Sequence, residues 1–471
     1  MPKIKINDQE VNVENGITIL QACESIGIEI PRFCYHEKLA IAGNCRMCLV
    51  EMEKSPKPIA SCAMPVTDGM VITTNSPLVK KARNGVMEFL LINHPLDCPI
   101  CDQGGECDLQ DQAMSYGRDK NRFSENKRAV KDKNLGPLIK TVMTRCIHCT
   151  RCVRFAQDVA GVSELGATGR GEEMEIDTFI EKTISSELSG NIIDLCPVGA
   201  LTSKPYAFEA RSWELSKTET IDIHDALGSN IRVDTRGREV KRVLPRINEE
   251  INEEWISDKT RYACDGLKNQ RLDKPYMKKN GNFEKVSWSE AYSFLIKKIN
   301  EISSDKIVGL TGDLTDMETQ FIVKEFFEKT IKSKYLDCRY DNHYVQNNHK
   351  TNYIFNPSIN GIEESDLIIL VGSNPRYEAT MLNARIRKAY LKNNVEILSF
   401  SDLGDLTYPY KTISNKVSDL DSITNSENEI YKKINLSKKP ILIIGESFFK
   451  LQSAKILFTK LKNLLNSLGK I

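Results

Sequence analysis

The N-terminal residues alternate between polar and apolar side chains in two short runs. The runs are Lys3–Ile6 and Glu10–Val13, and the polar residues Asn7 and Asp8 lie between them. A period of two is typical of strands, so the pattern predicts a β-hairpin. A helix is expected next, because Thr18 and Gln21 fit a capping box and Gly27 supplies a C-terminal stop. A hairpin followed by a helix is how a β-grasp fold begins, and many other small folds begin in the same way.

A second helix is predicted from Ser76-Pro77 to His94. Ser76 is a suitable N-cap, and proline is favoured at the first helical position. Pro95 disfavours helical geometry in the residue before it, so we expect the helix to end at His94. Its predicted apolar face carries Val79, Ala82, Val86, Phe89 and Leu90.

After about residue 272, short apolar runs alternate with helical stretches. The stretch Ala379–Leu391 suits a helix. Four runs are apolar enough for buried parallel strands, namely Lys306–Leu310, Asp366–Val371, Val395–Phe400 and Pro440–Ile444. This alternation predicts a doubly wound α/β domain. No G-x-G-x-x-G or P-loop motif is present, so dinucleotide binding has little support.

Composition narrows the class of protein. The chain has 471 residues, 40 % of them hydrophobic, which is enough for several folded domains. Lys plus Arg (65) nearly balances Asp plus Glu (64), so the net charge offers no case for binding nucleic acid. No stretch approaches the roughly 18 consecutive apolar residues of a membrane helix. The N-terminus lacks an apolar signal core and an Arg-rich leader, so we expect a soluble, non-secreted chain with no direct membrane span.

Cysteines are concentrated at one end: twelve of 14 lie in the first 200 residues, before Cys264 and Cys338. In a reducing compartment such clustering points to metal binding or redox chemistry. The spacing of Cys23 places it on the core face of the first helix. The first candidate ligand set is Cys34, Cys45, Cys48 and Cys62. It suits a [2Fe–2S] cluster, and the spacing leaves zinc open as an alternative.

The second candidate set combines one histidine with three cysteines. His94 is followed by Cys98, Cys101 and Cys107, and two glycines in the last gap allow the chain to wrap tightly. Three cysteines within so short a stretch favour a ligand role for the histidine. Zinc accepts three cysteines and one histidine as well as iron does, so spacing alone does not name the metal.

The third candidate set is the most specific. Cys146, Cys149 and Cys152 form a C-x2-C-x2-C run, which lets three thiolates bind three irons of a cubane. The fourth member is remote, as Cys196 followed by Pro197. This set predicts one [4Fe–4S] cluster. Arg145, Arg151 and Arg154 flank the run and are expected either to tune the cluster or to lie on a solvated surface.

These motifs resemble those of the large iron–sulfur subunit of respiratory complex I, called the 75 kDa subunit in mitochondria and the G subunit in bacteria. The stretches that carry the resemblance are Phe33–His36, Gly43–Glu51, His94–Asp102 and Cys196–Leu201. The resemblance implies one [2Fe–2S] cluster on the first set and a [4Fe–4S] cluster on each of the others. It also implies that the C-terminal domain is a molybdopterin-oxidoreductase-like domain without molybdopterin.

The resemblance implies a multidomain chain of α+β and α/β parts. The expected parts are a β-grasp ferredoxin-like domain (1–78), a [4Fe–4S] domain with one histidine and three cysteine ligands (79–117), a [4Fe–4S] ferredoxin-like domain (118–214), a small domain of the molybdopterin-oxidoreductase type without its cluster (215–271), and a shortened α/β domain (272–471). Family members commonly run further, so either this is a shortened variant or a separate polypeptide supplies the rest.

The implied function is electron transfer within the proton-pumping NADH:quinone oxidoreductase, with no complete active site on this chain. The implied partners are other complex I subunits, notably the flavin- and NADH-binding subunit and the downstream iron–sulfur subunits. The implied location is the peripheral arm, on the matrix side of the mitochondrial or the cytoplasmic side of the bacterial inner membrane. The alternatives are a free-standing relative of iron-only hydrogenase or NAD-linked formate dehydrogenase, and a zinc-stapled scaffold.

Overall fold

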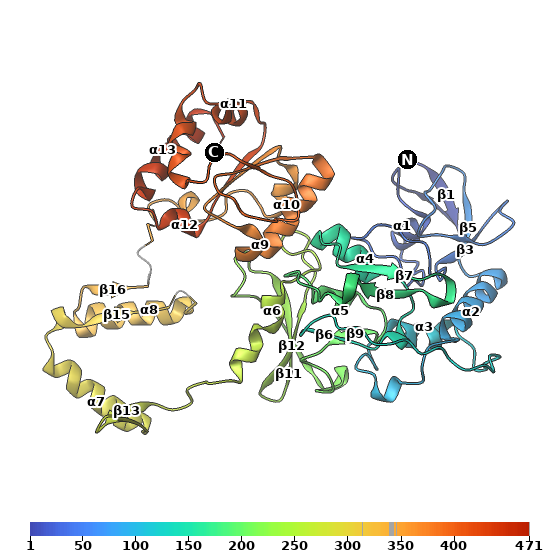
Figure 1. Ribbon diagram of the computed structural model, residues 1–471, viewed down its shortest axis with the longest axis horizontal. Helices are drawn as coiled ribbons and strands as arrows, with labels where there is room; N and C mark the ends of the chain where they lie inside the picture. The colour runs from blue at the N-terminus through green and yellow to red at the C-terminus, as the bar shows by residue number, and fades with distance from the viewer. Residues whose placement is uncertain (313, 339–342, 345, 471) are drawn as a thin grey trace. The chain divides into compact units, whose positions relative to one another are not determined.

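The computed structural model describes residues 1–312, 314–338, 343–344 and 346–470 (Figure 1). They form two compact units, each made of three segments of the chain. The first unit comprises Met1–Glu219, Arg232–Leu244 and Trp255–Arg261. The second comprises Thr220–Ile231, Pro245–Glu254 and Tyr262–Ile471. No helix in the described part of the chain is both long and apolar enough to cross a lipid bilayer.

The first unit begins with a mixed five-stranded sheet of order β2-β1-β5-β3-β4. Its strands are β1 (Lys3–Ile6), β2 (Gln9–Asn12), β3 (Leu49–Met52), β4 (Ile59–Ala60) and β5 (Val71–Thr73). The predicted hairpin is confirmed, since β1 pairs antiparallel with β2. Helix α1 (Ile19–Glu24) has the predicted capping box at Thr18 and packs on the sheet. Cys23 lies fully buried in this core, as predicted.

Helix α2 (Pro77–Leu91) begins at the predicted cap, where the hydroxyl of Ser76 accepts a hydrogen bond from Val79 N–H. It ends before His94, which corrects the prediction. The Nζ of Lys127 donates to the last carbonyls, those of Leu91 and Ile92, and so caps the helix early.

The buried face of α2 also differs from the predicted one. It carries Val79, Arg83 and Met87, whereas Phe89 is 76 % exposed. An arginine can lie on this face because its apolar stem packs while its guanidinium donates to Leu49 O at 3.0 Å. The helix therefore packs through residues four apart, and the polar character of Arg83 concealed this in the sequence.

The rest of the first unit consists of short elements joined by loops. Its helices are α3 (Asp108–Tyr116), α4 (Arg151–Phe155) and α5 (Asn191–Leu195). Two antiparallel ribbons pair β6 (Ile139–Thr141) with β9 (Leu201–Ser203), and β7 (Leu165–Thr168) with β8 (Glu175–Thr178). Further along the chain are a three-stranded sheet of β10 (Ser216–Ile221), β11 (Asn230–Arg236) and β12 (Glu239–Pro245), and helix α6 (Asp258–Tyr262).

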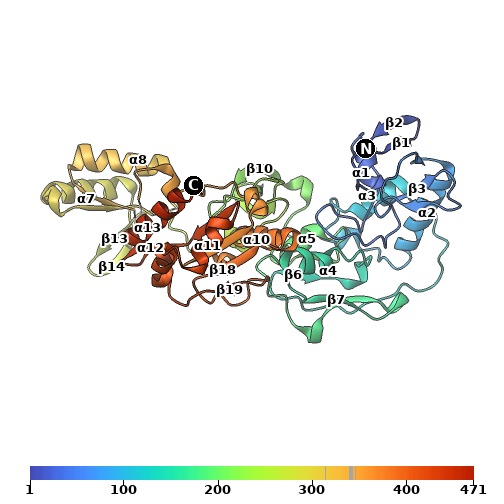
Figure 2. The same ribbon diagram turned by 90° about the horizontal axis from the view of Figure 1, so that it is seen from above.

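The second unit contains a parallel sheet of order β19-β18-β17-β20, within the orange and red part of Figures 1 and 2. Its strands are β17 (Leu367–Val371), β18 (Glu396–Ser399), β19 (Lys411–Thr412) and β20 (Pro440–Ile444). Helix α10 (Thr380–Asn393) covers one face, and α11 (Glu429–Leu436) and α13 (Ala454–Ser467) cover the other. The short helices α9 (Pro375–Glu378) and α12 (Glu446–Phe449) follow β17 and β20. The α/β alternation and three of the four predicted strands are confirmed.

The fourth predicted strand is not part of that sheet. β15 (Val308–Leu310) pairs with β16 (Tyr335–Asp337) in a separate two-stranded sheet, and Val308 is 62 % exposed. The prediction of a parallel strand is confirmed here, but its predicted burial is wrong, because an apolar run shows that a segment can be buried without showing what covers it. The neighbouring elements are β13 (Tyr276–Lys279), β14 (Asn282–Lys285), α7 (Trp288–Glu301) and α8 (Met317–Glu325).

Candidate metal centres

The structure brings the first cysteine set together around two loops of the N-terminal sheet. Cys34, Cys48 and Cys62 are buried, and the N–H of Cys34 donates to the sulfur of Cys45 at 3.4 Å. Hydrogen bonds from the thiols of Cys45 and then Cys62 lower the pKa of Cys34. A hydrogen bond from Cys62 likewise lowers the pKa of Cys48 to about 7. Four sulfurs within such close reach fit the ligand set of a [2Fe–2S] cluster.

The backbone of the same loop explains how it turns so tightly. Gly43 and Arg46 both have left-handed backbone angles, with φ of 62° and 61°. Glycine adopts this region without strain, and it lies just before the Cys45–Cys48 pair. The second left-handed residue lies between the two cysteines.

In the second set, His94 has a chemically available nitrogen. Its Nδ1 is buried, and no hydrogen-bond partner is found for it among the described residues. Burial, together with the nearby positive charges of Arg145 and Lys127, lowers the pKa of His94 to about 4. The imidazole is therefore neutral at physiological pH, as a metal ligand must be. A buried polar atom without a partner fits a site that a metal completes.

The cysteines of the second set differ in exposure. Cys101 and Cys107 are buried, whereas Cys98, at the start of a 3-10 turn, is exposed. The thiol of Cys107 lies 3.7 Å from Pro197 O. A Cβ placed on Gly199 would lie 2.1 Å from the sulfur of Cys101. Two cysteines of the second set thus lie against the segment that follows Cys196 in the third.

All four cysteines of the third set line one cavity. The other lining residues are almost wholly apolar: Met143, Ile147, Thr150, Ile176, Val198, Ala200 and Leu201. Burial raises the pKa of all four thiols, so a cationic metal is needed to hold them as thiolates. An apolar cavity bounded by four sulfurs from two segments of the chain fits a cubane cluster.

Within the described residues, no three His, Cys, Asp or Glu side chains are arranged to hold a single metal ion.

The three arginines beside the third set are all buried, at 4 %, 8 % and 9 % exposure for Arg145, Arg151 and Arg154. The interpretation as a solvated surface is therefore wrong for each of them. Arg145 Nε donates to the Asp97 carboxylate at 3.0 Å, and its Nη1 donates to Gly199 O at 3.4 Å. It thereby joins the second set to the loop after Cys196.

Arg151 and Arg154 join the third set to the first. Arg151 donates to Tyr35 O at 2.8 Å. Arg154 donates to Cys34 O and, at 3.0 Å, to Cys149 O. A further bond in the same region runs from Asn44 Nδ2 to His148 O at 3.0 Å. The third set is thus bonded through backbone carbonyls to the loop of the first.

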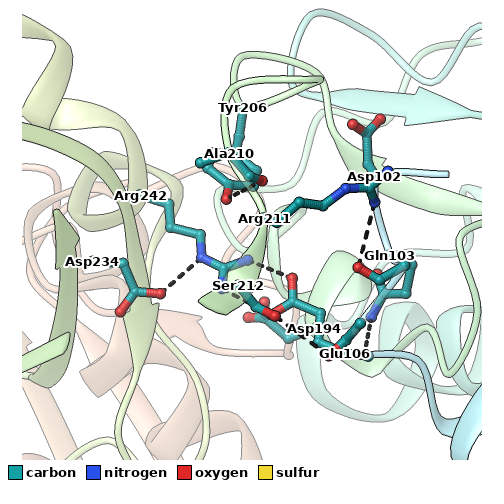
Figure 3. Close-up of polar contacts among 12 residues, drawn as sticks. Asp102, Gln103, Glu106, Asp194, Tyr206, Ala210, Arg211, Ser212, Asp234 and Arg242 are labelled. Atoms are coloured by element: carbon teal, nitrogen blue, oxygen red, sulfur yellow. Dashed lines mark hydrogen bonds and ion pairs between the residues drawn. The ribbon is translucent and has the colours of Figure 1, made fainter. Parts of the chain in front are cut away.

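A polar network that supports the second set was not predicted. Arg211 donates to Cys101 O and to Pro99 O, each at 2.6 Å. Figure 3 shows Arg242 between Asp234 and Glu106, and its guanidinium bonds to both carboxylates at 2.6–2.9 Å. These arginines lie more than a hundred residues after the loop they hold, and no local motif marks them in the sequence.

Family models cover nearly the whole chain. The matches are a 2Fe-2S iron-sulfur cluster binding domain (2–77), an NADH-ubiquinone oxidoreductase-G iron-sulfur binding region (83–122), an NADH-quinone oxidoreductase subunit 3 ferredoxin-like domain (136–202), an NADH-ubiquinone oxidoreductase NDSU1/NuoG-like 4Fe-4S domain (215–265) and molybdopterin oxidoreductase (271–471). They define a mixed α/β iron–sulfur protein with a molybdopterin-oxidoreductase-like domain. Within 215–265 the chain has a single cysteine, Cys264.

Comparison with curated proteins shows which family of iron–sulfur proteins this chain is similar to. The chain is 58 % identical over 458 residues to the NADH-ubiquinone oxidoreductase 75 kDa subunit of Reclinomonas americana, covering 94 % of this chain and 66 % of that protein. It is 54 % identical to the G subunit of the NADH-quinone oxidoreductase of Rickettsia felis, covering 95 % and 67 %. For the 78 kDa subunit of Neurospora crassa the identity is 55 %, covering 94 % and 60 %. The chain belongs to this family of complex I iron–sulfur subunits and spans about two thirds of the relatives' length.

A solved structure of NAD+-reducing [NiFe]-hydrogenase in the H2-reduced state is also similar. It has 25 % identity and a TM-score of 0.41, covering 45 % of this chain and 90 % of that one. This likeness is too weak to bear on function.

Proposed function

We propose that this chain is an iron–sulfur electron-transfer subunit of a proton-pumping NADH:quinone oxidoreductase. A [2Fe–2S] cluster binds Cys34, Cys45, Cys48 and Cys62, and [4Fe–4S] clusters bind His94, Cys98, Cys101 and Cys107 and, separately, Cys146, Cys149, Cys152 and Cys196. The observation that carries the proposal is the apolar cavity lined by the four sulfurs of the third set. Family membership supports it, since the chain is 58 % identical to a 75 kDa subunit.

The contacts among the sets support an order of electron transfer. The third site neighbours the first through Arg154, which bonds to Cys34 O and Cys149 O. It neighbours the second through Cys107, whose thiol lies near Pro197 O. Electrons that cross this chain therefore pass through the third site on their way between the other two.

The clusters supply one-electron chemistry when bound, and the protein supplies position, charge and dryness. Apolar residues around the third set exclude water from its sulfurs. The neutral imidazole of His94 offers nitrogen in place of a fourth thiolate in the second set, which leaves that site less negative by one charge.

The domain boundaries, partners and location are also part of the proposal. We assign 1–78 to a β-grasp ferredoxin-like domain, 79–117 and 118–214 to the two [4Fe–4S] domains, and 215–271 and 272–471 to molybdopterin-oxidoreductase-like parts without molybdopterin. The partners are the flavin- and NADH-binding subunit and the downstream iron–sulfur subunits. The chain lies in the peripheral arm, on the matrix or cytoplasmic side of the membrane.

Iron and sulfide analysis with low-temperature EPR of the reduced protein tests the proposal. About ten irons per chain are expected, in one [2Fe–2S] and two [4Fe–4S] clusters. His94→Cys should shift one [4Fe–4S] signal, because a thiolate replaces a neutral nitrogen. Cys152→Ala should remove or convert the other. Zinc in place of iron, or fourteen or more irons, would contradict the assignment.

A further inference from the structure

The guanidinium of Arg154 contacts the backbone of two proposed cluster sites at once. Its Nη2 donates to Cys34 O of the first set and, at 3.0 Å, to Cys149 O of the third. Its Nη1 donates to Ala40 O at 2.6 Å, and its Nε donates to Thr150 Oγ1 at 3.3 Å. The four bonds divide evenly between the two sites, so one side chain fixes the position of both loops.

The charge of Arg154 is poorly screened by water, because the residue is only 9 % exposed. Arginine stays protonated in proteins, so this is a permanent cation. Thiolate-bound clusters are anionic, and reduction adds one more negative charge. A buried cation stabilises the reduced form more than the oxidised form, which raises the reduction potential.

We propose that Arg154 raises the reduction potentials of the first and third clusters together, as one cation shared between them. This rests on the proposed function, since it requires clusters at both sites. Arg154 is a positioning residue, because it bonds to the loops that carry the ligands and not to the ligand atoms. Because one cation acts on both clusters, their reduction potentials rise together. This favours electron exchange between the first and third clusters.

EPR-monitored redox titration of the full chain tests this with Arg154→Gln. We expect the ratio of reduced to oxidised cluster, at a fixed potential, to fall about tenfold at both sites, equivalent to about 59 mV for a one-electron couple. The second cluster should keep its potential. Arg122→Gln is the matched control, because it removes the same charge from a side chain that is 74 % exposed and paired with Glu88. It should leave all three potentials unchanged.

A shift at only one of the two sites, or at neither, would overturn the proposal. If Arg154→Gln does not retain both clusters, Arg154→Lys decides. Lysine keeps the positive charge but lacks the planar guanidinium that makes the four hydrogen bonds. The ratio of reduced to oxidised cluster should therefore fall by less than tenfold at both sites. A fall of tenfold or more at either site in that variant would overturn the proposal, because the positive charge is still present. Failure of the proposed function itself is distinguishable, because the unsubstituted chain would then lack the three EPR signals.

Discussion

Gly199 lies where a side chain would collide with the proposed second site. A Cβ there would lie 2.1 Å from the sulfur of Cys101 and 3.2 Å from Cβ of Gln103. We expect Gly199→Ala to displace Cys101 and lower the iron content from about ten toward about six per chain, since one cubane is lost. Iron analysis and EPR of the second cluster measure this. Gly166→Ala is the control, because no atom lies within 4 Å of its added Cβ.

If Gly199→Ala retains all its iron with an unchanged second EPR signal, Cys101 is not held where the structure has it. The choice of glycine at 199 would then need another reason.

Sequence reasoning could group the cysteines into candidate ligand sets, but it could not place the arginines around them. Ligand spacing reflects the local reach of a loop, so Cys146, Cys149 and Cys152 could be grouped from the chain alone. The same spacing does not tell which ligand set lies beside which. The bonds of Arg154 to Cys34 O and Cys149 O connect sites that lie more than a hundred positions apart, and only the fold brings them together.

Among the elements, the parallel sheet was predicted more accurately than its surroundings. β17 is buried along its whole length, and a continuous apolar run is the expected signature of such a strand. β15 has a similar composition but a different environment, with Val308 and Leu310 both more than half exposed. Periodicity and hydrophobicity describe what a segment can bury, and tertiary contacts decide what it does bury.

Asp366 joins the start of β17 to the turn before β20. Its carboxylate accepts from Ser437 Oγ and from the N–H groups of Lys438 and Lys439, at 2.7 and 3.0 Å for the latter two. Burial alone would raise the pKa of Asp366, but these hydrogen bonds outweigh it and lower the pKa. The stabilisation is therefore complete above the unfolded value of about 3.9 and is lost as pH falls through the lower folded value.

We expect Asp366→Asn to lower the free energy of unfolding at pH 7 by about 1 kcal/mol, because a charged acceptor of backbone N–H groups is lost. Urea unfolding at pH 7 and at pH 3 measures the difference between variant and parent. The difference should shrink at pH 3, where the parent carboxylate is becoming protonated. Asp305→Asn, at an exposed position, provides the control. An equal difference at both pH values would show that charge is not the cause.

In the molecule as a whole, the proposed cluster ligands lie in the first unit, and the parallel sheet with its helices lies in the second. All twelve proposed ligands lie between residues 34 and 196, inside the first unit. The second unit has its own core, formed around β17 and its two helical layers. The cysteine map of the sequence predicted this division, whereas the contribution of the 245–254 segment to the second unit could not be read from it.

Residues 245–254 are held by hydrogen bonds and ion pairs around Arg385. Loss of these contacts should not affect the clusters. Arg385, on α10, donates to Glu249 O, Ile251 O and Glu363 Oε1 at 2.5–3.3 Å, and its side chain is 3 % exposed. Arg385→Met would leave the half-buried Glu363 with Lys388 as its remaining cation and would remove the bonds to the backbone of Glu249 and Ile251. Losing hydrogen bonds from a charged group typically costs about 1.5–3 kcal/mol each, so the second unit should become less stable.

Limited proteolysis of the Arg385→Met chain, with iron analysis of the same sample, measures both consequences. Cleavage within 245–254 should become faster, while iron stays at about ten per chain, because no proposed ligand depends on this network. Lys392→Met removes a charge from an exposed position on the same helix and should change neither result. Loss of iron together with faster cleavage would mean that the second unit supports the clusters directly. The division into a redox unit and a separate cysteine-poor unit would then be wrong.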